Sequence, residues 1–93
     1  MDANGYPESS ELKRIREWPY QDAAGLMDFI RSIWWTADWG WKQTGMVFDI
    51  STGGWSGNES IIEALQENAM FWILCWWESR RGGHYRFEIP EIK

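Results

Sequence analysis

Two glycine-rich turns, and the apolar segment between them, constrain the fold of this chain more than any other feature. The first turn lies at residues 52–58 (TGGWSGN) and the second at residues 80–85 (RRGGHY). The segment between them contains neither proline nor glycine, and its apolar residues recur at helical spacing. We therefore predict one helix from about residue 57 to residue 80, ended by Gly82-Gly83.

This predicted helix has a recognisable start and a broad apolar surface. Ser56 and Glu59 have the spacing of a capping box, which satisfies the first free amides of a helix. Met70, Leu74 and Trp77 add apolar surface on the side opposite the main stripe, so the second half is apolar nearly all round. The main stripe, expected to face the core, consists of Ile62, Leu65, Ala69, Trp72, Ile73 and Trp76.

Shorter elements are predicted on both sides of this helix. Leu12, Ile15 and Trp18 recur every third residue before Pro19, which favours a short helix, with an edge strand as the alternative. Apolar and polar residues alternate at positions 46–51 and again at 84–89, which predicts two strands that pair and rest on the long helix. A second helix, capped by Asp22, is predicted from the stripe Leu26, Phe29, Ile30, Ile33 and Trp34.

These elements define the expected fold class and domain organisation. Residues 1–9 are polar and are expected to form a flexible N-terminal tail. Residues 10–93 form one α+β domain, in which two or three helices pack on a short antiparallel sheet.

The aromatic content shows how so small a chain can form a core. Nine Trp, four Phe and three Tyr each remove roughly 150–250 Å² from water when buried. This number of tryptophans, together with a helix that is apolar on two sides, exceeds what a 93-residue monomer buries and predicts a homo-oligomer.

The single cysteine and the hydropathy pattern predict a cytoplasmic protein. Cys75 cannot form an internal disulfide and is expected to be a buried thiol in a reducing cytosol. The N-terminus lacks the pattern of a secretion signal. The longest apolar run, residues 69–77, is too short to span a bilayer, so no membrane partner is expected.

The distribution of charge limits the partners that this chain can bind. The formal net charge is −5, and residues 43–79 contain no Lys or Arg. A protein that grips duplex nucleic acid needs a continuous basic face to displace counterions. We therefore exclude duplex nucleic acid and expect any bound anion to be small.

The two turns carry the candidate ligand-binding residues. Glycines let the backbone approach a ligand, and the free amides at a helix start favour negative charge. Arginines beside a flexible turn can hold an anion in two hydrogen bonds, and a neighbouring Trp can stack on a planar base. Helix capping and helix termination explain each turn better than ligand binding does when the turn is taken alone, and only the coincidence of the two turns with many tryptophans favours a ligand. The candidate residues are Thr52, Gly53, Gly54, Trp55, Ser56, Gly57, Asn58, Arg80, Arg81, His84 and Tyr85.

A helix of 24 residues would place these two turns about 36 Å apart. A single site would then need a shorter helix, a bend or a second subunit.

Catalysis and metal binding rank below ligand binding. Residues 54–58 resemble a nucleophile elbow, but Asn58 stands where that motif has its second glycine. One His and one Cys do not make a metal-ligand cluster. We expect no enzyme activity, no catalytic residue, no metal site and no cofactor.

Several of these residues together resemble a known group of proteins. The segments STGGWSGNE (residues 51–59) and RGGHY (residues 81–85), with Phe71-Trp72 and Trp76, are similar to small proteins of unassigned function from tailed bacteriophages and prophages, especially of actinobacteria. The resemblance covers roughly residues 18–88. It implies a phage origin and action in the cytoplasm of an infected host, and it supplies no catalytic residues.

The function expected from the sequence is that of a small non-enzymatic binding protein. It would capture a small anionic ligand, such as a nucleotide signal, in the infected host. The alternative is a protein–protein module that inhibits or redirects a host protein through an aromatic surface.

Overall fold

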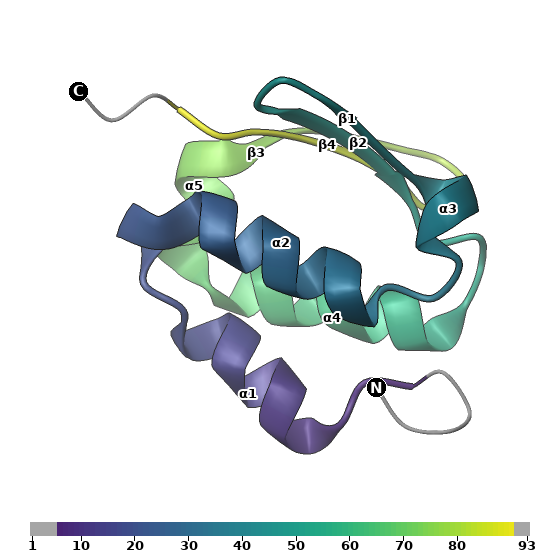
Figure 1. The fold of residues 1–93 in the computed structure, drawn as a ribbon, viewed down its shortest axis with the longest axis horizontal. Helices are drawn as coiled ribbons and strands as arrows, with labels where there is room; N and C mark the ends of the chain where they lie inside the picture. Colours follow the sequence, from purple (N-terminus) through teal and green to yellow (C-terminus); the bar gives the residue numbers. More distant parts are fainter. Residues whose placement is uncertain (1–5, 91–93) are drawn as a thin grey trace.

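The computed structural model describes residues 6–90 and shows a small α+β fold (Figure 1). In chain order the elements are α1 (Ser9–Glu17), a short 3-10 turn (Tyr20–Asp22), α2 (Ala23–Ile33), α3 (Ala37–Gly40), β1 (Trp41–Thr44), β2 (Val47–Ser51), α4 (Ser56–Glu67), α5 (Ala69–Cys75), β3 (Trp76–Arg80) and β4 (His84–Glu88).

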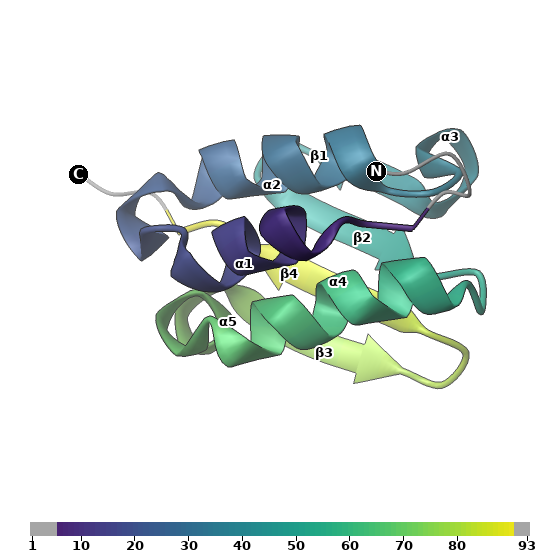
Figure 2. The same ribbon diagram turned by 90° about the horizontal axis from the view of Figure 1, so that it is seen from below.

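The four strands form one antiparallel sheet in the order β1-β2-β4-β3. All the longer helices lie on one side of this sheet: α2 and α4 cross beneath it, and α1 lies between them on the outside (Figures 1 and 2). The α+β class and the antiparallel sheet are therefore confirmed. Within residues 6–90 there are five α-helices, where the sequence predicted two or three.

The core lies between the sheet and the helices. The predicted apolar stripe of α2 is buried there except for Phe29, which is partly buried. Asp22 caps this helix, as predicted, by accepting a hydrogen bond from Gly25 N (3.3 Å). The largest fully buried apolar side chains come from helices and strands alike: Ile15, Leu26, Met27, Ile30, Ile61, Leu65, Phe71 and Phe87.

The predicted helix over residues 57–80 is wrong, because it is interrupted at Asn68. The buried Asn68 side chain donates hydrogen bonds from Nδ2 to the carbonyls of Ile15 and Trp18 (2.9 Å each). Its Oδ1 accepts from Phe71 N (3.4 Å), which caps the start of α5. Asn68 thus ends α4, turns the chain into a new helix and ties α1 to both of them.

The residues after this break also leave the predicted helical stripe. Residues 76–80 form strand β3, so Arg80 lies on a strand. Ile73 is 73% exposed and Trp76 is 42% exposed, where the helical phase predicted burial. The predicted capping box is wrong too: the N-cap of α4 is Trp55, its side chain makes no capping hydrogen bond, and Ser56 is already helical.

The remaining predicted elements have mixed outcomes. Helix α1 and strands β2 and β4 are confirmed, and the two strands pair. Strand β1 was not predicted. Residues 1–5 of the predicted tail lie outside the described residues, whereas Tyr6 packs on Trp55 with a ring separation of 4.8 Å.

The helices between residues 6 and 90 include none that is both long and apolar enough to cross a membrane.

Candidate functional site

One face of the sheet is covered by no helix of residues 6–90, and its side chains come from alternate residues of all four strands. We call it the open face. The strand register aligns two rows across it. The first row runs Lys42, Asp49, Arg86 and Glu78, from β1 to β3. The second row runs Ser51, His84 and Arg80, from β2 to β3.

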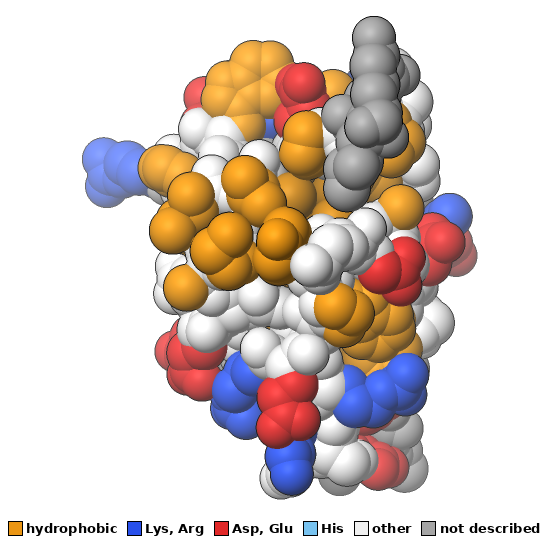
Figure 3. Space-filling view, turned by 90° about the vertical axis from the view of Figure 1, so that its left-hand side faces the viewer, with side chains coloured by type: hydrophobic (Ala, Val, Ile, Leu, Met, Phe, Trp, Pro, Cys, Tyr) orange, Lys and Arg blue, Asp and Glu red, His pale blue; other side chains and the backbone are white. Residues whose placement is uncertain are grey.

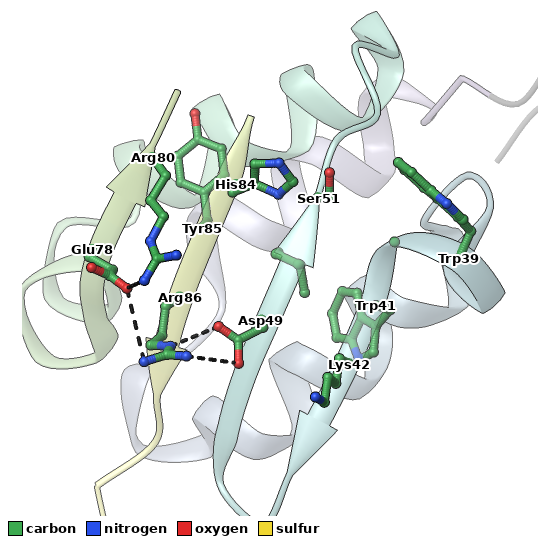
Figure 4. Close-up of a pocket in the computed structure, with 12 residues that line it drawn as sticks. Trp39, Trp41, Lys42, Asp49, Ser51, Glu78, Arg80, His84, Tyr85 and Arg86 are labelled. Carbon is green, nitrogen blue, oxygen red and sulfur yellow. Dashed lines mark hydrogen bonds and ion pairs between the residues drawn. The ribbon is translucent and has the colours of Figure 1, made fainter. Parts of the chain in front are cut away.

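The first row is held by ion pairs centred on Arg86. Its Nε donates to Asp49 Oδ1 (2.7 Å) and its Nη2 to Asp49 Oδ2 (3.4 Å), a bidentate pair. Its Nη1 lies 3.9 Å from Glu78 Oε1, an oxygen that also accepts from Arg80 Nη2 at 3.0 Å. The hydrogen bonds to Asp49 raise the pKa of the Arg86 guanidinium above its already high value, so Arg86 stays charged. These ion pairs hold the charged side chains of β2, β4 and β3 in place across the open face (Figure 4).

A hollow of about 450 Å³ lies over these two rows, and we call it the open-face hollow. In Figure 4 His84 and Ser51 point toward one another across β4 and β2, while Trp39 stands beyond Ser51 at the end of α3. Trp39 is 70% exposed. The residues that line the hollow are Trp39, Gly40, Trp41, Lys42, Asp49, Ile50, Ser51, Glu78, Arg80, His84, Tyr85 and Arg86.

The charges around the hollow leave a small positive excess. Lys42, Arg80 and Arg86 face two carboxylates, those of Asp49 and Glu78. The two arginines are paired with these carboxylates, whereas Lys42 makes no ion pair with any of the described residues. In a chain whose formal net charge is −5, the side chains around the open-face hollow thus carry one more positive than negative charge.

The two glycine-rich turns lie side by side, in contrast to the separation expected from a 24-residue helix. Thr52 N donates to Gly83 O at 3.0 Å, so the loop before α4 contacts the turn between β3 and β4. Gly83 has a φ of 80°, and a Cβ at this position would collide with Thr52 Oγ1. The contact forms because α4 ends at Glu67 and β3 returns the chain along the sheet.

The candidate residues of the sequence divide into two groups. Arg80, His84 and Tyr85 line the open-face hollow, and Arg81 lies in the adjoining turn. The residues of the first turn, 52–58, do not line it.

Residues of the first turn hold the fold together. Asn58 is buried, and its Nδ2 donates to the carbonyls of Trp35 (3.0 Å) and Thr52 (3.3 Å) while its Oδ1 accepts from Trp35 N (2.9 Å). Ser56 Oγ donates to the Tyr6 hydroxyl (3.3 Å). The Trp55 ring stacks on Trp35 at 5.3 Å.

The glycines of this turn have different structural roles. Gly53 lies beside the Trp39 ring, and Gly57 is buried in the first turn of α4, whereas Gly54 faces open space and adopts a φ of 75°.

Sequence reasoning missed Lys42, Asp49, Ser51, Glu78 and Arg86 as residues of the site. A signal for two of them was present. Alternation at residues 46–51 and 84–89 already places Asp49 and Arg86 on the polar side of their strands, and pairing the two strands brings these residues together. No comparable signal existed for Lys42 or Glu78, because their strands were not predicted.

Among residues 6–90 no three His, Cys, Asp or Glu side chains are grouped so that they could hold a metal ion. In comparisons with known proteins, no family model, curated protein or solved structure matches this chain.

Proposed function

We propose that this protein binds a small anionic ligand with a planar ring, such as a nucleotide, in the open-face hollow, without transforming it. The observation that carries the proposal is the composition of the hollow: three cations against two carboxylates, with an exposed Trp at its rim. Its volume of about 450 Å³ lies in the range of roughly 300–1,000 Å³ that is usual for small-molecule sites.

The anionic part of the ligand would lie between Lys42 and the second row. Lys42 has no carboxylate partner within the described part of the chain, so its charge is available to a phosphate or carboxylate. Ser51 and His84 are opposite each other in the strand register, and their side chains offer further hydrogen-bonding groups in the second row. Arg80 extends this row toward the edge of the sheet.

The planar part would stack on Trp39. This side chain is the most exposed Trp of those described, and its ring lies beside Gly53. An exposed ring presents a flat surface to a nucleobase, an interaction worth about 1–3 kcal/mol per base. Trp39 thus takes the role that the sequence assigned to Trp55.

The test is a thermal-shift screen of mononucleotides and cyclic dinucleotides, followed by isothermal titration with the nucleotide that raises the melting temperature most. Inorganic phosphate and the matching nucleoside separate the contribution of the anion from that of the ring. We expect the nucleotide to bind more tightly than either part and to quench Trp fluorescence.

Point variants locate the site. Lys42→Ala and His84→Ala should each weaken binding at least tenfold without lowering the melting temperature of the free protein, because both side chains lie on the open face. Trp39→Ala should remove the difference between nucleotide and phosphate. Lys13→Ala is the matched control, since Lys13 is an exposed lysine on α1. Equal affinity of Lys42→Ala and wild type for the nucleotide would contradict the proposal.

A second candidate function is docking to a host protein through an aromatic surface. It is favoured by the exposure of Ile73 (73%) and Trp77 (52%), which lie on α5 and β3, away from the α3 end of the sheet. Ile73→Ser would weaken such docking and leave nucleotide binding unchanged, which distinguishes the two functions.

A further inference from the structure

Strand β3 is an edge of the sheet, and its outer side pairs with no other strand among residues 6–90. Unpaired N–H and C=O groups on such an edge are a template for another strand. Natural edges are often protected by lysine, proline or a bulge. Here the register shift between Trp76 and Glu78 marks a bulge at the start of β3, but residues 78–80 pair regularly with β4.

The side chains of this edge are complementary to themselves. Glu78 and Arg80 lie on the same face and form an ion pair (3.0 Å). If a second β3 pairs antiparallel to the first with Ser79 opposite Ser79, each Glu78 lies opposite the Arg80 of the other copy. Directly opposite residues in such a pair are about 4.5–5.5 Å apart at Cβ. The two Glu78 and two Arg80 side chains would then form a closed ring of alternating charges.

The same alignment accounts for Arg81. This residue makes no ion pair within the part of the chain that the structure describes. In the self-paired arrangement Arg81 lies opposite Trp77 of the other copy, whose ring is half exposed. A hollow of about 240 Å³ beside Trp77 is lined by Leu74 and Glu88, which offer an apolar wall and a carboxylate to a guanidinium.

We propose that this protein forms a symmetric dimer through β3, in which two four-stranded sheets join into one eight-stranded sheet. The occupant of the edge is a second copy of this chain, because the charge order Glu78-Ser79-Arg80 is complementary to its own reverse. An unrelated strand would have to carry the same order by coincidence. The inference is independent of the proposed function, since it concerns assembly in the absence of ligand.

The exposed apolar side chains of α5 adjoin this interface. Met70, Ile73 and Leu74 are exposed on the helix that leads directly into β3. Figure 3, which views the molecule from its left-hand side in Figure 1, shows hydrophobic side chains gathered over that end. An antiparallel pair centred on Ser79 places the α5 helices at opposite ends of the joined strands, so the apolar side chains of each α5 would lie on the side of the other copy's β3–β4 turn.

Charge reversal tests the alignment. Sedimentation from low to high micromolar concentration should show wild type changing from 11.0 kDa to twice that mass. Glu78→Arg and Arg80→Glu each place like charges opposite one another and should raise the dimer dissociation constant at least tenfold. The double variant E78R/R80E restores opposite charges and should dimerise like wild type. Glu63→Arg, an exposed change on α4, is the matched control.

A cross-link provides a second measurement that does not depend on these charges. Ser79→Cys should form a covalent dimer under mild oxidation, because the two cysteines would lie opposite each other. Thr44→Cys, on the other edge strand, should not. The proposal is overturned if wild type remains monomeric at all concentrations, if the dimer survives both single charge reversals, or if Ser79→Cys cross-links no faster than Thr44→Cys. If wild type dimerises, but the dimer survives both charge reversals and Ser79→Cys cross-links no faster than Thr44→Cys, the interface lies on another surface.

Discussion

Phe87 and Arg86 are neighbours on β4, yet their side chains enter different environments. Phe87 is fully buried and contacts Phe71 (ring centroids 5.8 Å apart) and Trp72 (5.5 Å). Arg86 lies on the open face between Asp49 and Glu78. The covered face of the sheet is fixed by packing against helices, and the open face by ion pairs between strands.

This difference indicates which face can change without loss of the fold. Burial of apolar area supplies most of the stability of a small domain, whereas ion pairs between partly exposed side chains contribute little. The open face can therefore carry binding residues, and the covered face cannot. Four substitutions test the comparison.

The largest effect is expected from Phe87→Ala. Removing a buried aromatic ring from the covered face should cost about 3–5 kcal/mol, a large share of the stability of a small domain. Urea unfolding followed by Trp fluorescence measures the loss. A cost below about 1 kcal/mol, the level of surface changes, would mean that the covered face is not the core.

Asn68→Ala should have the next largest effect. The variant leaves the carbonyls of Ile15 and Trp18 without their side-chain donor and removes the cap of α5, at a cost of about 1–3 kcal/mol. Gln66→Ala, an exposed change in the same helix end, should be close to neutral. Equal melting temperatures for the two variants would contradict the role of Asn68.

Arg86→Met should lower the melting temperature much less than Phe87→Ala does. The methionine keeps an unbranched apolar side chain at this position and removes the guanidinium group that lies over Trp77 and next to Asp49 and Glu78. Raising the salt concentration should reduce the difference between wild type and this variant, because salt screens exposed charges. A loss as large as that of Phe87→Ala would show that the ion pairs of the open face stabilise the fold as much as the packing of the covered face does.

At neutral pH, the ionisation of the Cys75 thiol is expected to change the free energy of unfolding least. Burial raises the pKa of its thiol to about 11 from a usual value near 9, so at pH 7 it is protonated in both the folded and the unfolded chain and adds no pH dependence. As pH rises from 9 toward 11, the unfolded chain loses this proton first, and stability should fall. Cys75→Ser, compared with wild type in urea melts across this range, isolates the contribution.

Reactivity gives a second measure of Cys75. A thiol reagent at pH 8 should modify native protein slowly and urea-unfolded protein quickly, because the thiolate is the reactive form. Rapid labelling of the native protein would show that the thiol is accessible.

The parts of the fold that the sequence predicted are those with local causes. The stripe of α2 and the alternation of β2 and β4 depend on neighbouring residues alone, so their periodicity was sufficient. The break at Asn68 depends on carbonyls 53 and 50 residues away, and no local pattern shows those partners. Trp76 and Trp77 lie at a bulge, so β3 lacks the alternation that would have revealed it.

The candidate site was predicted in part for the same reason. Arg80, His84 and Tyr85 were found because they follow a conspicuous turn. Lys42 joins them only through the pairing of β1 with β2, a register that no short motif reports. The first glycine-rich turn was assigned to a ligand, yet Asn58 uses its amide to hold residues of its own chain. A motif suited to binding an anion is equally suited to binding backbone.

The position of β4 has a consequence for synthesis. Among residues 6–90 it is the last strand in sequence order, yet it lies inside the sheet between β2 and β3. As the chain leaves the ribosome, β2 and β3 have no common neighbour until residues 84–88 emerge. Part of the apolar surface of the helices therefore stays uncovered until β4 is made, and a chain that stops before residue 84 would expose its interior to chaperones and proteases.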